Sequence, residues 1–341
     1  MKHHLKTFTL FIALLFGNVS IGYAQDKGFK AYESGDYAEA LRQWKPLAEQ
    51  GNAGAQYNLG IMYKKGQGVI QDYKTAVKWY RLAAEQGDAS AQDALGVLYG
   101  RGQGVIQDHK TAVKWYRLAA EQGNASAQTN LGFKYEKGQG VIQDYKTSVK
   151  WYRLAAEQGY AVPQNSLGVS YHEGRGVAQD YKTAVKWYRL AAEQGNADAQ
   201  KNLGLMYYKG LGVSQNKKTA VKWWQLAAEQ GKVGAQKNLG LMYDKGLGVG
   251  QDYKTAMKWY RLAAEQGDAS AQTQLGVMYG TGKGVAQDNV LAHMWFNIAA
   301  SNGSKKAIKN RDIIAERITS ADLSKAQQMA KQCVEKNYKG C

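Results

Sequence analysis

The sequence predicts an all-α protein, a superhelical α/α solenoid of stacked helix hairpins. A sequence repeat of 36 residues recurs along the chain at a constant spacing. The glycines that mark it are Gly51, Gly87, Gly123, Gly159, Gly195, Gly231, Gly267 and Gly303. A fixed period of roughly 20 to 50 residues is typical of stacked-repeat architectures. Each period holds two stretches with helical spacing of apolar residues, and small residues recur at the same places, as a repeated helix contact requires.

The first residues differ from the rest and predict a signal peptide over residues 1–24. Lys2 and Lys6 form a basic start, and a short apolar run follows. Gly22 and Ala24 then supply small residues at the two positions that a signal peptidase recognises. An uncleaved membrane anchor is the alternative, but the apolar run is short and is interrupted by Gly17 and Asn18. We therefore expect cleavage after Ala24, a periplasmic or secreted protein, and no transmembrane segment after cleavage.

Each repeat predicts one hairpin of two helices, helix A and helix B, of about 14 residues each. In residues 53–88, Asn52 is a suitable N-cap for helix A, and Gly66 is a suitable left-handed residue at its end. After a glycine-containing connector, Asp72 can cap helix B, which ends before Gly87. A hairpin this small cannot bury its apolar face alone, so we expect it to stack on its neighbours. The apolar stripe of helix B consists of Tyr73, Ala76, Val77, Tyr80, Ala83 and Ala84.

These units resemble the Sel1-like repeat, a relative of the tetratricopeptide repeat with a longer loop between its helices. The family pattern A-x-x-x-L-G-x-x-Y-x-x-G-x-G-V-x-x-D-x-x-x-A-x-x-W is matched in the first unit by Ala55, Leu59, Gly60, Tyr63, Gly66, Gly68, Val69, Asp72, Ala76 and Trp79. Later units depart from it at few places, such as Ser148, Pro163 and Asn216. We expect Pro163 to shorten its helix A. The resemblance implies a right-handed superhelix whose concave side is lined by helix A.

On this pattern the seven repeats occupy residues 53–88, 89–124, 125–160, 161–196, 197–232, 233–268 and 269–304. Residues 25–52 resemble a tetratricopeptide hairpin and form an N-terminal cap, in which we expect Pro46 to kink or shorten the second helix. Residues 305–341 resemble the C-terminal end of many bacterial Sel1-like proteins and form a helical cap, with a helix capped near Ser320. Cys333 and Cys341 lie in this cap and could form a disulfide in an oxidising compartment.

Comparison among the repeats places the candidate binding surface on helix A. The columns aligned with Tyr57, Met62 and Lys64 vary most between units, so we expect them to face solvent. Residues three and four apart share a helix face, so these columns form one broad surface. The alternative interpretation is neutral drift on a solvated face. For the methionines of the Met62 column alone, we favour core packing. The predicted partner-binding residues are Tyr57, Asp93, Lys134, Glu136, His172, Lys201, Tyr208, Lys237 and Asp244.

Helix B carries a basic ridge, because Lys74, Lys78 and Arg81 recur in most units and lie away from the apolar stripe. The chain has a formal net charge of +17, so the ridge could bind an acidic envelope polymer. The plainer interpretation is a solvated face that acidic residues of the same helix partly balance. We interpret Trp79 and Tyr80 beside these charges as packing residues, and we expect no nucleic-acid partner.

No group of residues for catalysis or metal binding stands out against the repeat. His172 and Glu173 form an isolated pair, and GTGKG at residues 280–284 lacks the spacing of a phosphate-binding loop. The resemblance implies a non-enzymatic adaptor that binds a protein or peptide in the concave groove, without a cofactor. Some cysteine-rich secreted relatives bind penicillin-like compounds and are described as β-lactamases, which is the enzymatic alternative. Those relatives carry a cysteine pair in each repeat, and this chain has none in its repeats.

Overall fold

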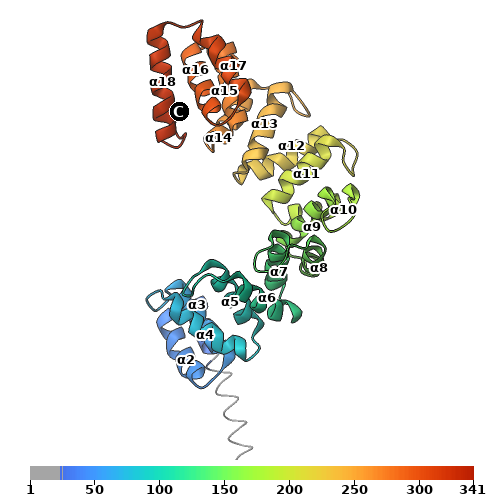
Figure 1. Ribbon diagram of the computed structural model, residues 1–341, viewed down its shortest axis with the longest axis vertical. Helices are drawn as coiled ribbons and strands as arrows, with labels where there is room; N and C mark the ends of the chain where they lie inside the picture. Colours follow the sequence, from blue (N-terminus) through green and yellow to red (C-terminus); the bar gives the residue numbers. More distant parts are fainter. Residues whose placement is uncertain (1–23, 25) are drawn as a thin grey trace, which may run out of the picture. The chain divides into compact units, whose positions relative to one another are not determined.

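The computed structural model describes residue 24 and residues 26–341, and every regular element within them is a helix (Figure 1). The prediction of an all-α protein built of helix pairs is therefore confirmed. The predicted signal peptide lies outside the described residues except for Ala24. The chain divides into two compact units. Unit 1 runs to Pro163 and includes Arg175–Val177, and unit 2 contains Gln164–Gly174 and Ala178–Cys341.

Helices A and B alternate along both units. Residues 26–33 are helical and precede α2 (Tyr37–Glu49) in the N-terminal cap. The helices A are α3 (Ala53–Lys65), α5 (Ala89–Arg101), α7 (Ala125–Lys137), α9 (Ala161–Glu173), α11 (Ala197–Lys209), α13 (Val233–Lys245) and α15 (Ala269–Thr281). The helices B are α4 (Tyr73–Glu85), α6 (His109–Glu121), α8 (Tyr145–Glu157), α10 (Tyr181–Glu193), α12 (Lys217–Glu229), α14 (Tyr253–Ala264) and α16 (Asn289–Ser301). The C-terminal cap contains α17 (Lys305–Ala315) and α18 (Ser320–Glu335).

The helices begin and end at the capping residues that local chemistry predicts. The side chain of Asn52 accepts a hydrogen bond from the backbone N–H of Ala55, 2.8 Å away, and Asp72 does the same for Lys74. These bonds satisfy N–H groups that have no partner inside the helix. Gly66 ends α3 with a φ of 69°, a left-handed conformation that glycine adopts without steric cost.

Neither proline shortens its helix, so the prediction of a shortened helix is wrong both at Pro46 and at Pro163. Pro46 lies inside α2, which nevertheless has 13 residues like the helices B of unit 1. Packing holds its last turn in place, since Leu47 and Ala48 are buried beside it. Pro163 is the third residue of α9, which also has 13 residues. In the first turn of a helix, the N–H that proline lacks has no intrahelical partner to lose.

Within each repeat, a glycine of helix A lets an aromatic ring of helix B lie directly on the helix backbone. A Cβ built on Gly96 would lie 2.6 Å from the ring of Tyr116, closer than two carbon atoms can approach. Burial raises the pKa of Tyr116 above its ordinary value. The same contact recurs at Gly60–Tyr80, Gly132–Tyr152, Gly168–Tyr188, Gly204–Trp224, Gly240–Tyr260 and Gly276–Phe296.

A ladder of buried glutamines joins successive repeats. Gln92 donates a hydrogen bond to the backbone carbonyl of Ala84 in the preceding helix B (3.1 Å), and its own oxygen accepts one from Gln122 at the end of the following helix B (2.8 Å). Buried polar groups cost free energy unless they are paired, and this arrangement pairs them at each junction. The glutamines of the ladder, all buried, are Gln56, Gln92, Gln128, Gln164, Gln200, Gln236 and Gln272.

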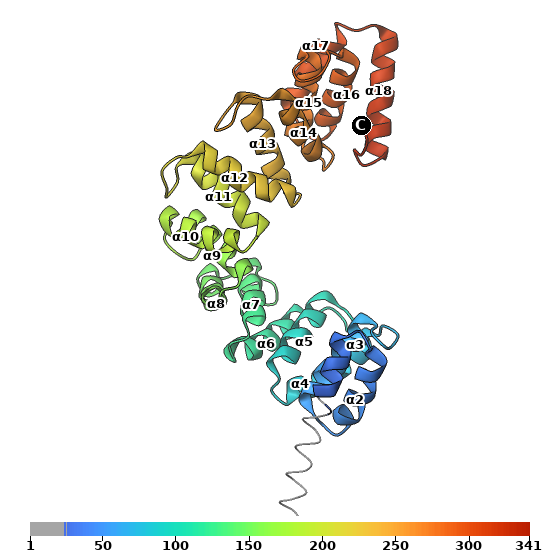
Figure 2. The same ribbon diagram turned by 180° about the vertical axis from the view of Figure 1, so that it is seen from behind.

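The C-terminal cap covers the last repeat, because α17 and α18 both pack on α16 (Figure 2). Met294 of α16, which stands where other repeats carry an exposed lysine, is accordingly buried. The N-cap of α18 is Thr319, one residue before the predicted position. A disulfide joins Cys333, near the end of α18, to Cys341.

Candidate functional site

Successive helices A approach one another and form a strip of surface in each unit, which we call the helix-A face. In unit 1, α5 contacts α7, and Asp93 of α5 accepts hydrogen bonds from Ser126 (2.8 Å) and Asn130 (3.0 Å) of α7. In unit 2, Lys232 at the start of α13 pairs with Asp198 of α11 at 2.7 Å. These polar contacts set the side chains of one repeat beside those of the next, so a ligand could contact several repeats at once.

The structure places the nine predicted binding residues in two environments. Two of them, Lys134 and Asp244, are buried, with exposed fractions of 7% and 8%. All seven members of the Met62 column are buried, so core packing is confirmed for its methionines, and the expectation that Lys134 faces solvent is wrong. That column consists of Met62, Leu98, Lys134, Ser170, Met206, Met242 and Met278. The half-buried residues that do lie on the helix-A face are Tyr57, Asp93, Glu136, His172, Lys201, Tyr208 and Lys237.

The helix-A face of unit 1 is centred on the carboxylate of Asp93. Burial raises the pKa of Asp93, and the hydrogen bonds from Ser126 and Asn130 offset part of that increase. The Tyr57 ring packs against the Tyr80 ring, with centroids 5.7 Å apart, and this contact fixes the phenol on the same face. A half-buried carboxylate beside a phenol can accept hydrogen bonds from an amine or a guanidinium group.

Lys134 lies in the core of unit 1 instead of on the binding face. Its Nζ lies 2.9 Å from Gln139 Oε1 and 3.3 Å from His109 Nδ1. Burial lowers the pKa of Lys134, because removal from water disfavours the ammonium form. Glu136 follows on the half-buried surface, where it accepts a hydrogen bond from Tyr152 Oη at 2.8 Å and pairs with Lys137.

The helix-A face of unit 2 presents aromatic rings and cations. His172 packs edge-on against Tyr181 and Tyr188, and burial lowers its pKa. The Tyr208 ring lies 5.4 Å from the Trp224 ring, centroid to centroid. Lys237 pairs with Asp268 at 3.3 Å. The two units therefore offer different chemistry, a carboxylate with a phenol in unit 1 and, in unit 2, aromatic rings beside lysines that pair with Asp198 and Asp268.

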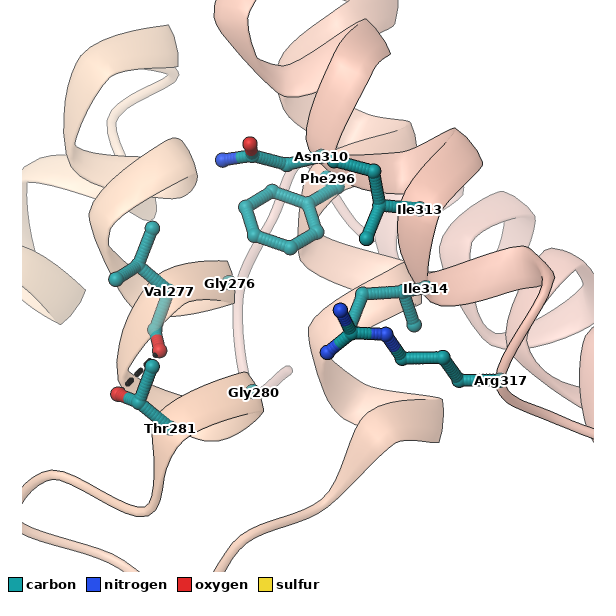
Figure 3. A pocket seen from close by; sticks show the side chains of 9 residues that line it. All are labelled: Gly276, Val277, Gly280, Thr281, Phe296, Asn310, Ile313, Ile314 and Arg317. Atoms are coloured by element: carbon teal, nitrogen blue, oxygen red, sulfur yellow. Dashed lines mark hydrogen bonds between the residues drawn. The ribbon is translucent and has the colours of Figure 1, made fainter.

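A pocket of about 200 Å³ lies between α15 and α17 at the end of unit 2 (Figure 3). Its walls are Val277 of α15, Phe296 of α16, and Ile313 and Ile314 of α17, and Arg317 extends over this apolar lining (Figure 3). Sequence analysis missed this pocket, because its residues come from the last repeat and from a cap that has no repeated counterpart. Apolar walls beside a guanidinium group suit a ligand with an apolar body and a negative charge.

The structure offers no metal site and no membrane-spanning helix among the residues it describes. No three side chains of His, Cys, Asp or Glu within residue 24 and residues 26–341 come together as metal ligands would. In the same part of the chain, every helix is too short or too polar to cross a membrane.

The basic ridge of helix B is exposed, but its arginines also join neighbouring repeats. Lys74, Lys78 and Arg81 are exposed on α4, and α6, α8 and α10 repeat the pattern. Arg117 of α6 donates a hydrogen bond to the hydroxyl of Tyr135 in the following helix A, at 2.8 Å. Equivalent bonds link Arg81 to Tyr99, Arg189 to Tyr207 and Arg261 to Tyr279.

The fifth repeat lacks this arginine, so the bond can be restored by substitution. Gln225 stands at the arginine position and donates to Glu229 of its own helix. We expect Gln225→Arg to bond to Tyr243 and to raise the free energy of unfolding by about 0.5–1 kcal/mol. Urea denaturation measures the change. Gln225→Lys is the control with the same charge, and an equal gain in both variants would show that charge alone is responsible.

The family of the chain follows from its repeats. The Sel1 repeat model matches residues 53–88, 89–124, 125–160, 164–196, 197–232, 233–268 and 269–304. The chain belongs to the Sel1 repeat family. The predicted resemblance is thus confirmed, and the match to the fourth repeat begins directly after Pro163. Sel1 repeat proteins generally act as non-enzymatic scaffolds that mediate protein–protein interactions.

Two solved structures resemble this Sel1 repeat protein over much of its length. One is c5321, a protective antigen of uropathogenic Escherichia coli strains, which is 30% identical with a TM-score of 0.56 and covers 93% of each chain. The other is a Sel1 repeat protein from Oxalobacter formigenes, 35% identical with a TM-score of 0.65, covering 70% of this chain and 96% of that one. No curated protein matches the sequence.

Proposed function

We propose that this Sel1 repeat protein is an exported, non-enzymatic adaptor that binds a protein or peptide partner along its helix-A face. The observation that carries this proposal is a contrast within each repeat. Buried positions such as the glutamine ladder and the glycine–aromatic pair are nearly the same in every unit, whereas the half-buried face differs in each. A constant scaffold that presents changing side chains suits recognition of an extended partner.

The helix-A faces of the two units differ in chemistry and support a partner that carries both basic and acidic side chains. The Asp93 carboxylate in unit 1 suits a lysine or arginine of the partner, because burial strengthens its hydrogen bonds to a cation. In unit 2, Lys201 and Tyr208 suit a carboxylate and an apolar or aromatic side chain. The basic, then apolar start of the sequence supports export, and we propose the periplasm or the extracellular medium as the place of action.

A crosslinking pull-down with the mature chain from Gln25 tests the proposal at physiological salt, against envelope and culture-medium extracts. The face variant carries Tyr57→Ala, Asp93→Ala, Glu136→Ala, His172→Ala, Lys201→Ala, Tyr208→Ala and Lys237→Ala. Lys134 and Asp244 stay unchanged, because they are buried and alanine in their place would leave a cavity in the core. We expect the native chain to capture a partner that the face variant loses, with both chains showing the same circular dichroism spectrum.

The matched control changes the ridge and leaves the face intact, through Lys78→Gln, Lys114→Gln, Lys150→Gln and Lys186→Gln. These lysines are exposed on the helices B. Capture should survive in this variant and should tolerate salt, because screening weakens exposed charge pairs most. Capture that the ridge variant loses and the face variant keeps would overturn the proposal and assign binding to an acidic polymer or protein on the ridge.

A further inference from the structure

Three isoleucines project into solvent from the loops of unit 1 that join helix A to helix B. Ile70, Ile106 and Ile142 are 90%, 91% and 91% exposed, whereas Val162 follows with 59% among the large apolar side chains described. They occupy the same position in three successive repeats. We call this set the isoleucine edge. Water solvates such side chains poorly, so their repeated exposure requires an explanation other than packing.

The loops that carry these isoleucines are held against one another in a row. Gly104, in the loop of Ile106, lies so close to the first residue of α4 that a Cβ there would meet Tyr73 O at 2.4 Å. Gly140, in the loop of Ile142, packs in the same way on His109 at the start of α6. Each loop therefore rests on the helix that follows the preceding loop, and the three isoleucines lie along one edge of unit 1.

Basic side chains accompany the isoleucine edge at both ends of each loop. Each helix A of unit 1 ends in an exposed cation next to the loop, and each helix B carries an exposed lysine in its first turn. The aspartate of each loop is already engaged: Asp108, for example, accepts hydrogen bonds from the backbone N–H of Lys110 and the hydroxyl of Thr111. The cations are Lys65, Arg101, Lys137, Lys74, Lys110 and Lys146.

The fold itself does not need isoleucine at this position. The corresponding residues of unit 2 are Ala178, Ser214, Gly250 and Ala286. Their loops keep the same left-handed glycine, with φ of 69° at Gly212 and 74° at Gly248, against 72° at Gly104. The isoleucines are therefore a property of unit 1 that is added to a loop already stable without them.

We propose that the isoleucine edge binds the surface of an anionic lipid membrane. Each isoleucine would enter the boundary between headgroups and acyl chains, and the neighbouring lysines and arginine would contact lipid phosphates. Single apolar side chains on separate loops, with cations between them, do not form the contiguous apolar core of a protein interface. They do suit a lipid surface, in which apolar acyl chains lie beneath negatively charged headgroups. There, the burial of apolar side chains and the attraction between cations and headgroups both favour binding. The isoleucines lie on loops outside the helix-A face, and Lys137 adjoins both surfaces through its ion pair with Glu136.

Flotation with large unilamellar vesicles tests the proposal on the full mature chain. The vesicles contain phosphatidylglycerol and phosphatidylcholine in one series and phosphatidylcholine alone in the other, at physiological salt. The test variant is Ile70→Ser, Ile106→Ser and Ile142→Ser, which copies the serine of the fifth repeat. We expect the partition coefficient on anionic vesicles to fall at least tenfold in this variant, since three aliphatic side chains lose their burial. On neutral vesicles, native binding should be weaker by a similar factor.

A matched control removes three other exposed apolar side chains of unit 1, through Leu82→Gln, Leu118→Gln and Leu154→Gln on the helices B. These leucines are also 36 residues apart and are 45%, 46% and 39% exposed. Their loss should leave vesicle binding unchanged while circular dichroism confirms folding. The proposal is overturned if the serine variant floats as well as the native chain, or if the native chain stays unbound. Isoleucine-dependent self-association in place of binding would also overturn it and make the edge an interface between copies.

Discussion

Gly96→Ala is expected to destabilise unit 1 by about 2–3 kcal/mol, although alanine is the better helix former. The added Cβ would lie 2.6 Å from the ring of Tyr116, which is only 4% exposed and has no room to move away. The helix or the ring must therefore shift, and the glutamine ladder and cap bonds nearby resist that shift. Urea denaturation measures the loss, and hydrogen exchange would localise it to α5 and α6.

Gly100→Ala is the matched control, because Gly100 lies one turn further along the same helix. A Cβ there would meet nothing nearer than the hydroxyl of Tyr116 at 3.7 Å, which is an ordinary contact. We expect this variant to be more stable by about 0.5–1 kcal/mol, the usual gain when alanine replaces glycine inside a helix. If the two substitutions change stability in the same direction, the contact between helix and ring does not explain the glycine.

Lys134→Met is expected to stabilise unit 1 by about 1–3 kcal/mol. The column of Lys134 holds methionine in the first, fifth, sixth and seventh repeats, so the new side chain fits a place already shaped for it. The native ammonium is buried, and Gln139 Oε1 accepts a hydrogen bond from it without neutralising its charge. Lys150→Met, at an exposed site of α8, is the control and should change stability by less than about 0.5 kcal/mol.

The stability of the native chain and that of Lys134→Met should also depend differently on pH. Burial lowers the pKa of Lys134 below its ordinary value of 10.5, so the folded chain releases this proton before the unfolded chain does. Stability rises with pH wherever the unfolded state binds more protons. The free energy of unfolding of the native chain should therefore rise relative to that of Lys134→Met as pH rises toward 10.5. Above that pH, the difference between the two proteins should be constant.

Buried tyrosines change the pH dependence of stability in the opposite direction, and they do so equally in the native chain and in Lys134→Met. Burial raises the pKa of Tyr116, so its phenol stays protonated in the folded state while the unfolded chain ionises, and stability falls at high pH. The comparison between native chain and variant cancels this common change. A difference that stays flat with pH would show that Lys134 titrates normally in the folded protein.

The sequence predicts most of the fold because local chemistry encodes its boundaries. Asn52, Gly66 and Asp72 act as caps in the first repeat, and capping residues at the same spacing in most other repeats make the hairpin visible without coordinates. The effects of Pro46 and Pro163 on helix length are predicted wrongly, because local sequence alone does not determine them. Their effect depends on the neighbours that hold the helix and on the exact turn in which the proline lies.

The candidate site is harder to predict, because variation between repeats has two causes. At Asp93, variation marks a half-buried surface, whereas at Lys134 it marks a core position that tolerates a long polar side chain. The partners of Lys134 come from another helix and from a loop, so the residue's own helix cannot reveal them. The isoleucine edge could have been noticed by comparing loops, but its exposure is a property of the folded chain alone.

The glutamine ladder has a consequence for how such a chain can evolve. Gln92 bonds to a backbone carbonyl of the preceding repeat and to a side chain of its own repeat, so neither bond depends on which particular neighbour is present. Recombination that deletes or duplicates a whole 36-residue unit would join compatible halves, whereas any other length would leave a buried amide without partners. A gene of this kind can change the length of its helix-A face in a single event and keep a folded product.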